Sequence, residues 1–333
     1  MNHRISCLNN ARGWLSLELS NCCNFQCRYC YRLRVDRMKQ CFMEKELLER
    51  LFLEIKRQGY QYAGVKLNWL GESTLHPRFE AILRELMCEP WQEAVCLETN
   101  LSLPVDVFCA SDLPDKPFYL TVSIDTLDRD KYAWLKGVDC LDEVLARVRE
   151  LIMFRDSAGR KFPRLRLQFI IMPENFDEIG RILVWAKGIG INSVRFQEDL
   201  TACEDYVLFR RLIAPLKQRE ADILFCEISG ENPVLIKEAG KRGPCEKLWA
   251  TPFVRADGSV LFCSEDPEMS MLLGNLNQSS FTDLWMGDKI SIWRRQHIEK
   301  CWELLPEKCR ACGAFWDTLP EAYFSDWIRE DSK

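Results

Sequence analysis

Three cysteines near the amino terminus stand close enough in sequence to bind one metal centre together. Cys23, Cys27 and Cys30 form a C-x3-C-x2-C motif that directly follows an apolar run, Leu15–Leu19, which predicts a first strand. Three thiolates can hold an iron–sulfur cube while leaving one iron without a protein ligand. An iron that is open to a small molecule can do chemistry, whereas a fully ligated cluster mostly transfers electrons or supports structure.

Two features of this motif leave alternatives open. A zinc site is the competing hypothesis, although zinc motifs usually add a second ligand pair nearby and none follows before Cys41. Cys22 offers a second register, because four residues instead of three separate Cys22 from Cys27. The spacing favours Cys23.

The composition of the chain limits the classes of protein to which it can belong. With 333 residues, of which 47% are hydrophobic, it can bury a large core, and we expect one large domain with a smaller one. The formal net charge of -5 argues against a protein that binds nucleic acid through its phosphates. The sequence has no signal peptide and no apolar stretch long enough to span a bilayer, which predicts a cytoplasmic protein without a membrane segment. We therefore expect the 17 cysteines to be reduced, and most of the scattered ones to be small buried hydrophobes.

Residues 14–197 alternate short β-rich runs with amphipathic stretches. The expected strands are Leu15–Leu19, Val65–Trp69, Val95–Thr99, Phe118–Ile124, Leu165–Ile171 and Ser193–Gln197, and the expected helices include Met43–Arg57, Arg78–Met87, Leu141–Phe154 and Phe176–Lys187. Six βα units predict an α/β fold with a parallel sheet, flat or curled into a partial barrel. Further along, Asp257-Gly258 between two short apolar runs predicts a hairpin.

Polar motifs follow the second, third and fourth expected strands. They are Gly71-Glu72-Ser73, Thr99-Asn100 and Ser123-Ile124-Asp125. Each motif alone is as often a turn, a loop start or a helix cap. Because the carboxyl ends of parallel strands meet at one edge of a sheet, where the reactive sites of α/β folds lie, we expect these motifs to converge with the cysteine loop.

Over Trp14–Gln197 the chain resembles the radical S-adenosylmethionine (radical SAM) superfamily. The resemblance is carried by the cysteine loop, in which Tyr29 directly precedes the third cysteine, and by the order of the strand-end motifs. It implies a partial (β/α)6 TIM-type barrel in which Cys23, Cys27 and Cys30 hold a [4Fe-4S] cluster. It further implies that S-adenosylmethionine (SAM) binds the open iron and is cleaved to a 5′-deoxyadenosyl radical, which takes a hydrogen atom from the substrate. A flavodoxin or ferredoxin is the expected electron donor.

The resemblance also implies where SAM is bound. The family's Gly-Gly-Glu-Pro segment, which holds the methionyl amino group, falls on Leu70-Gly71-Glu72-Ser73 and differs from it at its first and last residues. Lys136 stands where the family usually has an arginine. Ser123 and Asp125 are expected at the ribose or carboxylate and Gln168 at the adenine, with Tyr29 and Asn100 as further cofactor contacts.

A second set of cysteines lies near the carboxyl terminus. It comprises Cys245, Cys263 and the pair Cys309 and Cys312, which form a C-x2-C motif. Spacing alone allows zinc or an iron–sulfur cluster equally, and because little apolar periodicity follows Pro244, a metal centre is expected to help hold this region. The pattern resembles the SPASM domain or its shorter twitch form, which implies a second, fully ligated [4Fe-4S] cluster. The expected division is 1–200 for the radical SAM core, 201–243 for a connecting segment, and 244–333 for the cysteine-rich SPASM/twitch domain and the carboxyl-terminal tail.

This architecture leads to one preferred reaction and three alternatives. The preferred reaction is dehydrogenation of a small polar substrate such as a sugar or aminocyclitol, with the second cluster accepting an electron and Arg195 or Glu198 acting as base. The first alternative is epimerisation with a cysteine as hydrogen donor, for which the candidates are Cys203, Cys226 and Cys301. The second is maturation of a peptide, which we expect less because the segment before the cysteine loop is too short for a leader-binding domain. A non-catalytic metal-binding scaffold is the third.

Overall fold

The computed structural model describes residues 13–34, 39–104, 106–198, 226–228, 243–245, 247–264, 266 and 268–312. At 34, 197, 198, 226–228 and 311 it describes the backbone alone. Most of the expected connecting segment 201–243, and the tail beyond 312, lie outside the described residues. Within the described part, no helix is both long enough and apolar enough to cross a membrane.

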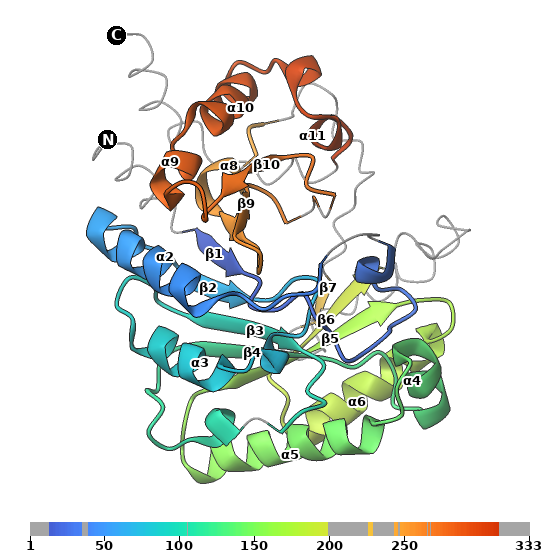
Figure 1. Ribbon diagram of the computed structural model, residues 1–333. Coiled ribbons are helices and arrows are strands. Elements are labelled where there is room, and N and C mark those ends of the chain that lie inside the picture. The colour runs from blue at the N-terminus through green and yellow to red at the C-terminus, as the bar shows by residue number, and fades with distance from the viewer. Residues whose placement is uncertain are drawn as a thin grey trace.

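The described strands form one ten-stranded sheet in the order β10-β9-β8-β1-β2-β3-β4-β5-β6-β7 (Figure 1). Strands β1 to β7 run parallel and span Trp14–Leu17, Gly64–Leu67, Val95–Thr99, Phe118–Ser123, Arg164–Ile171, Ser193–Glu198 and Cys226–Ile228. Each of the six expected strands is present, with its ends within two residues of the prediction. The α/β fold with a partial barrel of βα units is confirmed.

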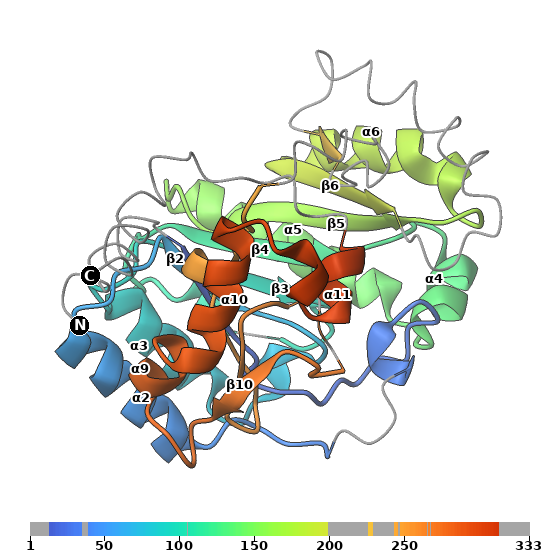
Figure 2. The same ribbon diagram turned by 90° about the horizontal axis from the view of Figure 1, so that it is seen from above.

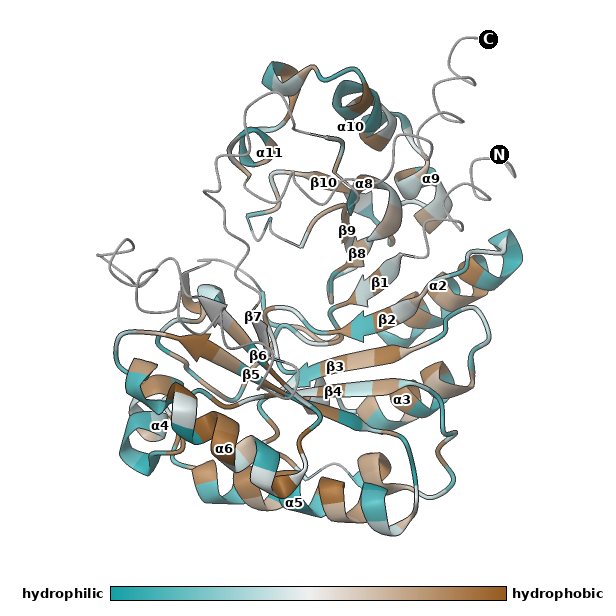
Figure 3. Ribbon diagram, turned by 180° about the vertical axis from the view of Figure 1, so that it is seen from behind, coloured by the Kyte–Doolittle hydropathy of each residue, from teal (hydrophilic) through white to brown (hydrophobic). Residues whose placement is uncertain are grey.

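Helices connect these strands and cover one side of the sheet. They are α2 (Lys45–Gln58), α3 (Phe79–Cys88), α4 (Arg129–Lys136), α5 (Leu141–Ser157) and α6 (Ile179–Ile189), with short 3-10 turns η1 (Tyr31–Arg34), η2 (Ser73–Leu75), η3 (Asp106–Cys109) and η4 (Phe176–Glu178). Figure 1 places α3, α5 and α6 together on one side, and Figure 3 shows hydrophobic and hydrophilic stretches alternating along α5 and α6. Apolar strand residues and helix residues share one buried cluster. The helices are therefore held to the sheet by apolar burial.

Helix α4 begins after Asp128, not after the polar motif at the end of β4. The Asp128 carboxylate caps the helix by accepting a hydrogen bond from the backbone N–H of Lys131 at 2.9 Å. The motif Ser123-Ile124-Asp125 is thus not the helix cap that the sequence left as an alternative, and its polar groups are available for another role.

The carboxyl-terminal part extends the same sheet. Strand β8 (Phe253–Val254) pairs in parallel with β1, and β9 (Ser259–Leu261) and β10 (Leu272–Asn275) continue in antiparallel order. The expected hairpin is confirmed, and Gly258 occupies its turn with φ +84°, a conformation that favours glycine.

Short helices complete this region and share the barrel's core. They are α8 (Lys247–Ala250), α9 (Phe281–Trp285), α10 (Asp288–Ile298), η6 (Trp302–Leu304) and α11 (Glu307–Ala311). Figure 2 shows α9 and α10 on the same side of the molecule as α2 and α3. Apolar residues from this region, such as Trp249, Val260 and Trp285, belong to the same buried cluster as the barrel strands. The region that lacks apolar periodicity in sequence is therefore stabilised by packing on the barrel.

A buried ion pair joins the end of β1 to the hairpin. Arg255 Nε lies 3.6 Å from Glu18 Oε2, and each side chain is only 1% exposed. The same carboxylate oxygen accepts a hydrogen bond from the backbone N–H of Ala256 at 3.2 Å, and the Arg255 guanidinium lies over the Trp69 ring. Burial raises the pKa of Glu18 to about 7, although Arg255 and the Ala256 N–H act in the opposite direction.

We expect Glu18→Gln to flatten the pH dependence of stability. A carboxyl with a pKa of about 7 when folded and near 4.5 when unfolded binds its proton more tightly in the folded state, so its contribution to stability falls as the pH rises between these values. The measurement is the denaturant midpoint at about pH 5 and about pH 7.5, with the exposed change Glu49→Gln as control. If Glu18→Gln loses as much stability over this range as the unchanged protein, the raised pKa is wrong.

Candidate functional site

The cysteine loop leaves the carboxyl end of β1 and is tied to α4. The backbone N–H groups of Gln26 and Arg28 donate to the carbonyls of Lys136 and Leu135 at 3.2 and 2.9 Å. Phe25, in the middle of the motif, is buried in a small apolar cluster with side chains of α4 and α5. The three cysteines of the motif are half-buried. Contacts with the barrel therefore hold the loop in place.

The three thiols lie within electrostatic range of one another. Burial raises the pKa of Cys23, and that of Cys27 to about 11, with a further rise for both from Cys30. Among the described residues, no three His, Cys, Asp or Glu side chains are placed to bind a single metal ion. A four-iron cube separates its thiolates more widely than one ion does, and three neighbouring thiols on a half-buried loop fit that larger group. The Cys22 thiol instead contacts Asn21 Oδ1 at 3.9 Å, which favours Cys23 as the ligand.

A buried ion pair behind the loop connects it to β4 and α4. Lys136 Nζ lies 2.5 Å from Asp125 Oδ2 and donates to the Tyr29 hydroxyl at 2.6 Å. That hydroxyl donates to the same carboxylate oxygen, and the backbone N–H of Ile170 donates to the other at 2.8 Å. Burial lowers the pKa of Lys136, but the Asp125 carboxylate together with Cys27 and Cys30 outweighs it, so the pKa is raised and the ammonium stays charged. Lys136 therefore neutralises Asp125 and holds Tyr29.

Glu72 is buried at the end of β2 and holds the neighbouring strand end. Its Oε1 accepts hydrogen bonds from the Thr74 and Thr99 hydroxyls, each at 2.8 Å, and its Oε2 accepts one from the backbone N–H of Asn100 at 2.8 Å. Burial raises the pKa of Glu72, while these donors act in the opposite direction. Glycine is required at Gly71, because a Cβ there would lie 2.0 Å from a backbone carbonyl oxygen at the start of the cysteine loop.

Two other residues that are expected to contact the cofactors at this edge form hydrogen bonds within the protein. Ser73 is buried, and its hydroxyl donates to the Leu67 carbonyl at 3.2 Å. Asn100 Nδ2 donates to Asn24 Oδ1 in the cysteine loop at 2.9 Å. The strand-end motifs and the cysteine loop therefore converge, as the parallel sheet predicts.

The side of the sheet away from the buried apolar residues carries polar side chains at alternating positions. We call it the polar face, and on β2 to β6 it consists of Lys66, Cys96, Glu98, Thr121, Ser123, Arg166, Gln168, Ser193 and Arg195. Ser123, Gln168 and Arg195 stand side by side in register on β4, β5 and β6. Two of the expected site residues therefore lie beside Arg195 on one face.

The polar face also contains residues that the sequence analysis missed. Arg195 Nη1 lies 3.7 Å from Glu98 Oε1 on β3, and the two side chains are 31% and 36% exposed. Burial raises the pKa of the Cys96 thiol to about 12, with a further rise from Glu98, so this thiol stays protonated near neutral pH. The sequence signal that could have identified Cys96 and Glu98 is their alternation with Leu97, a buried residue that stands between them.

The four cysteines of the second set all pack against the apolar core. Cys263 and Cys309 are buried within it, and Cys245 and Cys312 are partly buried against it. The Cys309 thiol lies 3.3 Å from Met271 Sδ. Thiols with little access to water fit a cluster whose irons are all bound by the protein.

The expected catalytic residues are spread over the molecule. Arg195 lies on the polar face, whereas Cys301 is half-buried between α10 and η6 in the carboxyl-terminal region. Cys203 lies outside the described residues, and only the backbone of Glu198 and Cys226 is described. Of these candidates, Arg195 is the one whose described side chain shares a face with the expected cofactor contacts.

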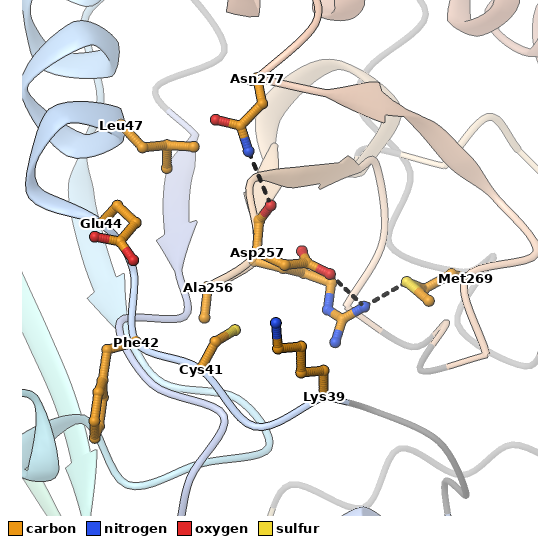
Figure 4. Close-up of a pocket in the computed structure, with 10 residues that line it drawn as sticks. Lys39, Cys41, Phe42, Glu44, Leu47, Ala256, Asp257, Met269 and Asn277 are labelled. Atoms are coloured by element: carbon orange, nitrogen blue, oxygen red, sulfur yellow. Dashed lines mark hydrogen bonds and ion pairs between the residues drawn. The ribbon is translucent and has the colours of Figure 1, made fainter.

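A separate cavity of about 400 Å³ lies between the segment after the cysteine loop and the hairpin (Figure 4). Lys39 and Cys41 point toward Ala256 and Asp257 across it. The described residues that line it include none of the expected site residues.

Comparison with known proteins agrees with this geometry. The Radical SAM superfamily model matches residues 17–192, and the SPASM model, an iron-sulfur cluster-binding domain, matches residues 245–313. The chain is 20% identical over 316 residues to the tungsten-containing aldehyde ferredoxin oxidoreductase cofactor-modifying protein of Pyrococcus furiosus, covering 84% of this chain and 83% of that protein. It is 29% identical over 210 residues to a probable GTP 3′,8-cyclase of Pyrococcus horikoshii, covering 62% of this chain and 63% of the cyclase, which is less than two thirds of its length.

Solved structures show the same fold. SuiB of Streptococcus suis bound to precursor peptide SuiA superposes with a TM-score of 0.64 at 16% identity, covering 94% of this chain and 73% of SuiB. The first matched model spans more than half of the chain and includes the whole cysteine loop, and the second includes all four cysteines of the second set. These two domains bind iron–sulfur clusters, and the first uses its cluster together with SAM. The chain belongs to the radical SAM superfamily and carries a SPASM iron–sulfur domain.

Proposed function

We propose that this enzyme cleaves SAM reductively and oxidises a small polar substrate, such as a sugar or aminocyclitol, bound at the polar face. The observation that supports this substrate class is the lining of the face, where hydroxyl and amide groups of Thr121, Ser123 and Gln168 stand next to the Arg195 and Glu98 pair. Such groups pair with substrate hydroxyls and amines. When bound, the two clusters and SAM supply the reductive cleavage, the hydrogen-atom abstraction and an acceptor for a further electron.

The residues at the strand ends would hold these cofactors. Cys23, Cys27 and Cys30 would bind the cluster that meets SAM, and the second set would bind the other cluster. Glu72 would present its buried carboxylate to the methionyl ammonium, since its surrounding hydroxyl and N–H donors fix the position of both oxygens.

Glu98 replaces Arg195 as the proposed base. A guanidinium stays protonated in proteins and cannot accept a proton, whereas a partly exposed carboxylate can. Oxidation of an alcohol carbon to a carbonyl removes the hydroxyl proton as well as a hydrogen atom, and Glu98 would accept that proton. Arg195, 3.7 Å away, would position the carboxylate.

Epimerisation is a second candidate, and Cys96 favours it. Its protonated thiol lies on the polar face, unlike Cys301, and could return a hydrogen atom to the opposite side of the substrate carbon. An electron and a proton would then have to restore the thiol. Because the structural neighbour SuiB was solved with a precursor peptide, peptides are the second substrate class to test.

Replacing Cys23, Cys27 and Cys30 together with alanine should abolish 5′-deoxyadenosine formation and leave one cluster of the two. Iron and sulfide counts after anaerobic reconstitution, about eight irons for the unchanged protein, and chromatography of 5′-deoxyadenosine check this. The matched change Cys309→Ala should lower the iron content and destabilise the carboxyl-terminal region while part of the SAM cleavage survives. Cleavage by the triple variant, or full iron content in Cys309→Ala, contradicts the assignment.

Glu72→Gln should weaken SAM binding by about tenfold or more without changing the iron content. The amide keeps the shape of the side chain but loses the negative charge opposite the ammonium, and hydrogen bonds to charged groups contribute about 1.5–3 kcal/mol. The measurement is equilibrium binding of SAM to the anaerobically reconstituted protein, with the exposed Glu49→Gln as control. An unchanged affinity would leave Glu72 with only the structural role of holding Thr99 and Asn100.

Turnover in deuterated water separates the two reactions. With SAM, a reductant and test sugars or aminocyclitols, oxidation should give 5′-deoxyadenosine and a product without solvent deuterium on carbon, and Glu98→Gln should slow product formation by about 10²-fold or more. Epimerisation should instead place solvent deuterium at the inverted carbon and should be lost in Cys96→Ala. If no test substrate raises 5′-deoxyadenosine formation above the substrate-free rate, the proposal for this substrate class fails.

A further inference from the structure

Trp69 connects the strand end that carries Glu72 to the second set of cysteines. It stands in the loop between β2 and η2, and its indole N–H donates to the backbone carbonyl of Ser264 at 2.8 Å. Ser264 directly follows Cys263, one of the four cysteines of the second set. One hydrogen bond across 195 residues therefore joins the neighbour of an expected cluster ligand to the expected SAM site.

Two ring contacts fix the orientation of the Trp69 side chain. Its ring meets the Phe253 ring on β8 edge-on, with the ring centres 4.5 Å apart. The Arg255 guanidinium lies 5.2 Å from the centre of the Trp69 ring. Edge-on and cation–π contacts have preferred geometries, so they hold the indole in direction as well as in place. Phe253 and Arg255 both belong to the hairpin that leads to Cys263, so Trp69 is held by that hairpin at three points.

Glu18 adds a second connection between the same segments. Burial raises the pKa of Glu18, and Arg255 and the backbone N–H groups of Ala256 and Leu70 act against that rise. Ala256 lies in the hairpin, whereas Leu70 directly follows Trp69. The carboxyl therefore lies between the hairpin and the start of the segment that carries Glu72.

The segment Leu70–Glu72 has no regular secondary structure, so its position depends on contacts of this kind. On one side it meets the cysteine loop, where the backbone N–H of Glu72 donates to the carbonyl of Cys22 at 2.7 Å. On the other side the hairpin holds it through Trp69 and Glu18. The position of the Glu72 carboxylate relative to the cysteine loop thus depends in part on the hairpin of the second cluster.

We propose that Trp69 is a positioning residue that couples the two cofactor sites, so that a loaded second cluster strengthens SAM binding at the first. Binding of Cys263 to the cluster would fix the Ser264 carbonyl and, through the indole N–H, the segment that carries Glu72. A segment that is already ordered costs less to order when SAM binds. Linkage requires the reverse effect, so bound SAM must stabilise the hairpin. The inference goes beyond the proposed function and rests on it in placing SAM at Glu72.

The first experiment measures SAM affinity by equilibrium binding to the anaerobically reconstituted protein. Trp69→Phe keeps the ring contacts and removes the N–H donor, so SAM should bind about threefold or more weakly at unchanged iron content. Trp293→Phe is the matched control and should bind SAM like the unchanged protein. Trp293 also lies against a phenylalanine and beneath a lysine, but no described group accepts a hydrogen bond from its N–H.

A double-mutant cycle tests whether the second cluster acts through Trp69. Cys263→Ala should weaken SAM binding when Trp69 is present and should have little further effect in Trp69→Phe. A purely structural role of Trp69 would instead make the two losses add. Iron counts of about four for Cys263→Ala confirm that the first cluster remains.

Hydrogen exchange measures the same coupling with every cluster ligand in place. In the unchanged protein, SAM should slow backbone exchange at residues 69–72 and also at residues 253–264 of the hairpin. In Trp69→Phe, saturated with SAM, the slowing at 69–72 should persist and that at 253–264 should be lost. Trp293→Phe should keep both.

The coupling is overturned by unchanged SAM affinity in Trp69→Phe, by an equal loss in Trp293→Phe, by additive losses in the cycle, or by hairpin protection that survives in Trp69→Phe. Product formation enters none of these measurements, so the proposed reaction is tested separately. If Glu72→Gln weakens SAM binding and Trp69→Phe does not, the coupling alone fails. If Trp69→Phe weakens it and Glu72→Gln does not, the proposed role of Glu72 fails and the coupling stands.

Discussion

Strand β1 is hydrogen-bonded on both of its edges, and the rest of the structure depends on that position. On one edge it pairs with β2, which begins the barrel, and on the other with β8, which begins the carboxyl-terminal sheet extension. The cysteine loop continues from its carboxyl end. A strand that is paired on both sides cannot move without breaking two ladders, so the loop has a fixed origin. The same strand therefore sets the position of the cysteine loop relative to the SPASM region.

Buried charges fix the remaining parts of this edge. Removing one partner of a buried ion pair leaves an uncompensated charge, which costs several kcal/mol, so each pair specifies an arrangement more strongly than it stabilises the fold. Asp125 and Lys136 form such a pair between β4 and α4, and Tyr29 connects the cysteine loop to it through hydrogen bonds. Glu18 and Arg255 form the corresponding pair between the end of β1 and the hairpin. One pair includes Glu18, which directly precedes the loop region in the chain, and the other contacts Tyr29 within the loop, so buried charges hold the loop near both of its ends.

The polar face differs from this edge in its accessibility. Its side chains range from buried, as for Thr121 and Gln168, to partly exposed, as for the Arg195 and Glu98 pair, and these polar groups suit a surface that binds a molecule from outside. A rigid sheet carries these groups, so their mutual positions are set before a substrate arrives. The proposed roles divide along this line, with cofactors held at the strand ends and the substrate held on the face below them.

The sequence by itself determined the strands, the helices, the cysteine loop and the hairpin, because each depends on residues within one short segment. Spacing of apolar residues, the positions of Cys23, Cys27 and Cys30, and the dipeptide Asp257-Gly258 are local signals. Only the tertiary structure decided that Lys136 pairs with Asp125, that Glu98 meets Arg195, and that Cys96 rather than Cys301 lies on the polar face. Contacts of this kind join distant segments, such as the bond between Ala256 and Glu18 across 238 residues. They depend on the curvature of the sheet and on the pairing of β8 with β1, which no local pattern encodes.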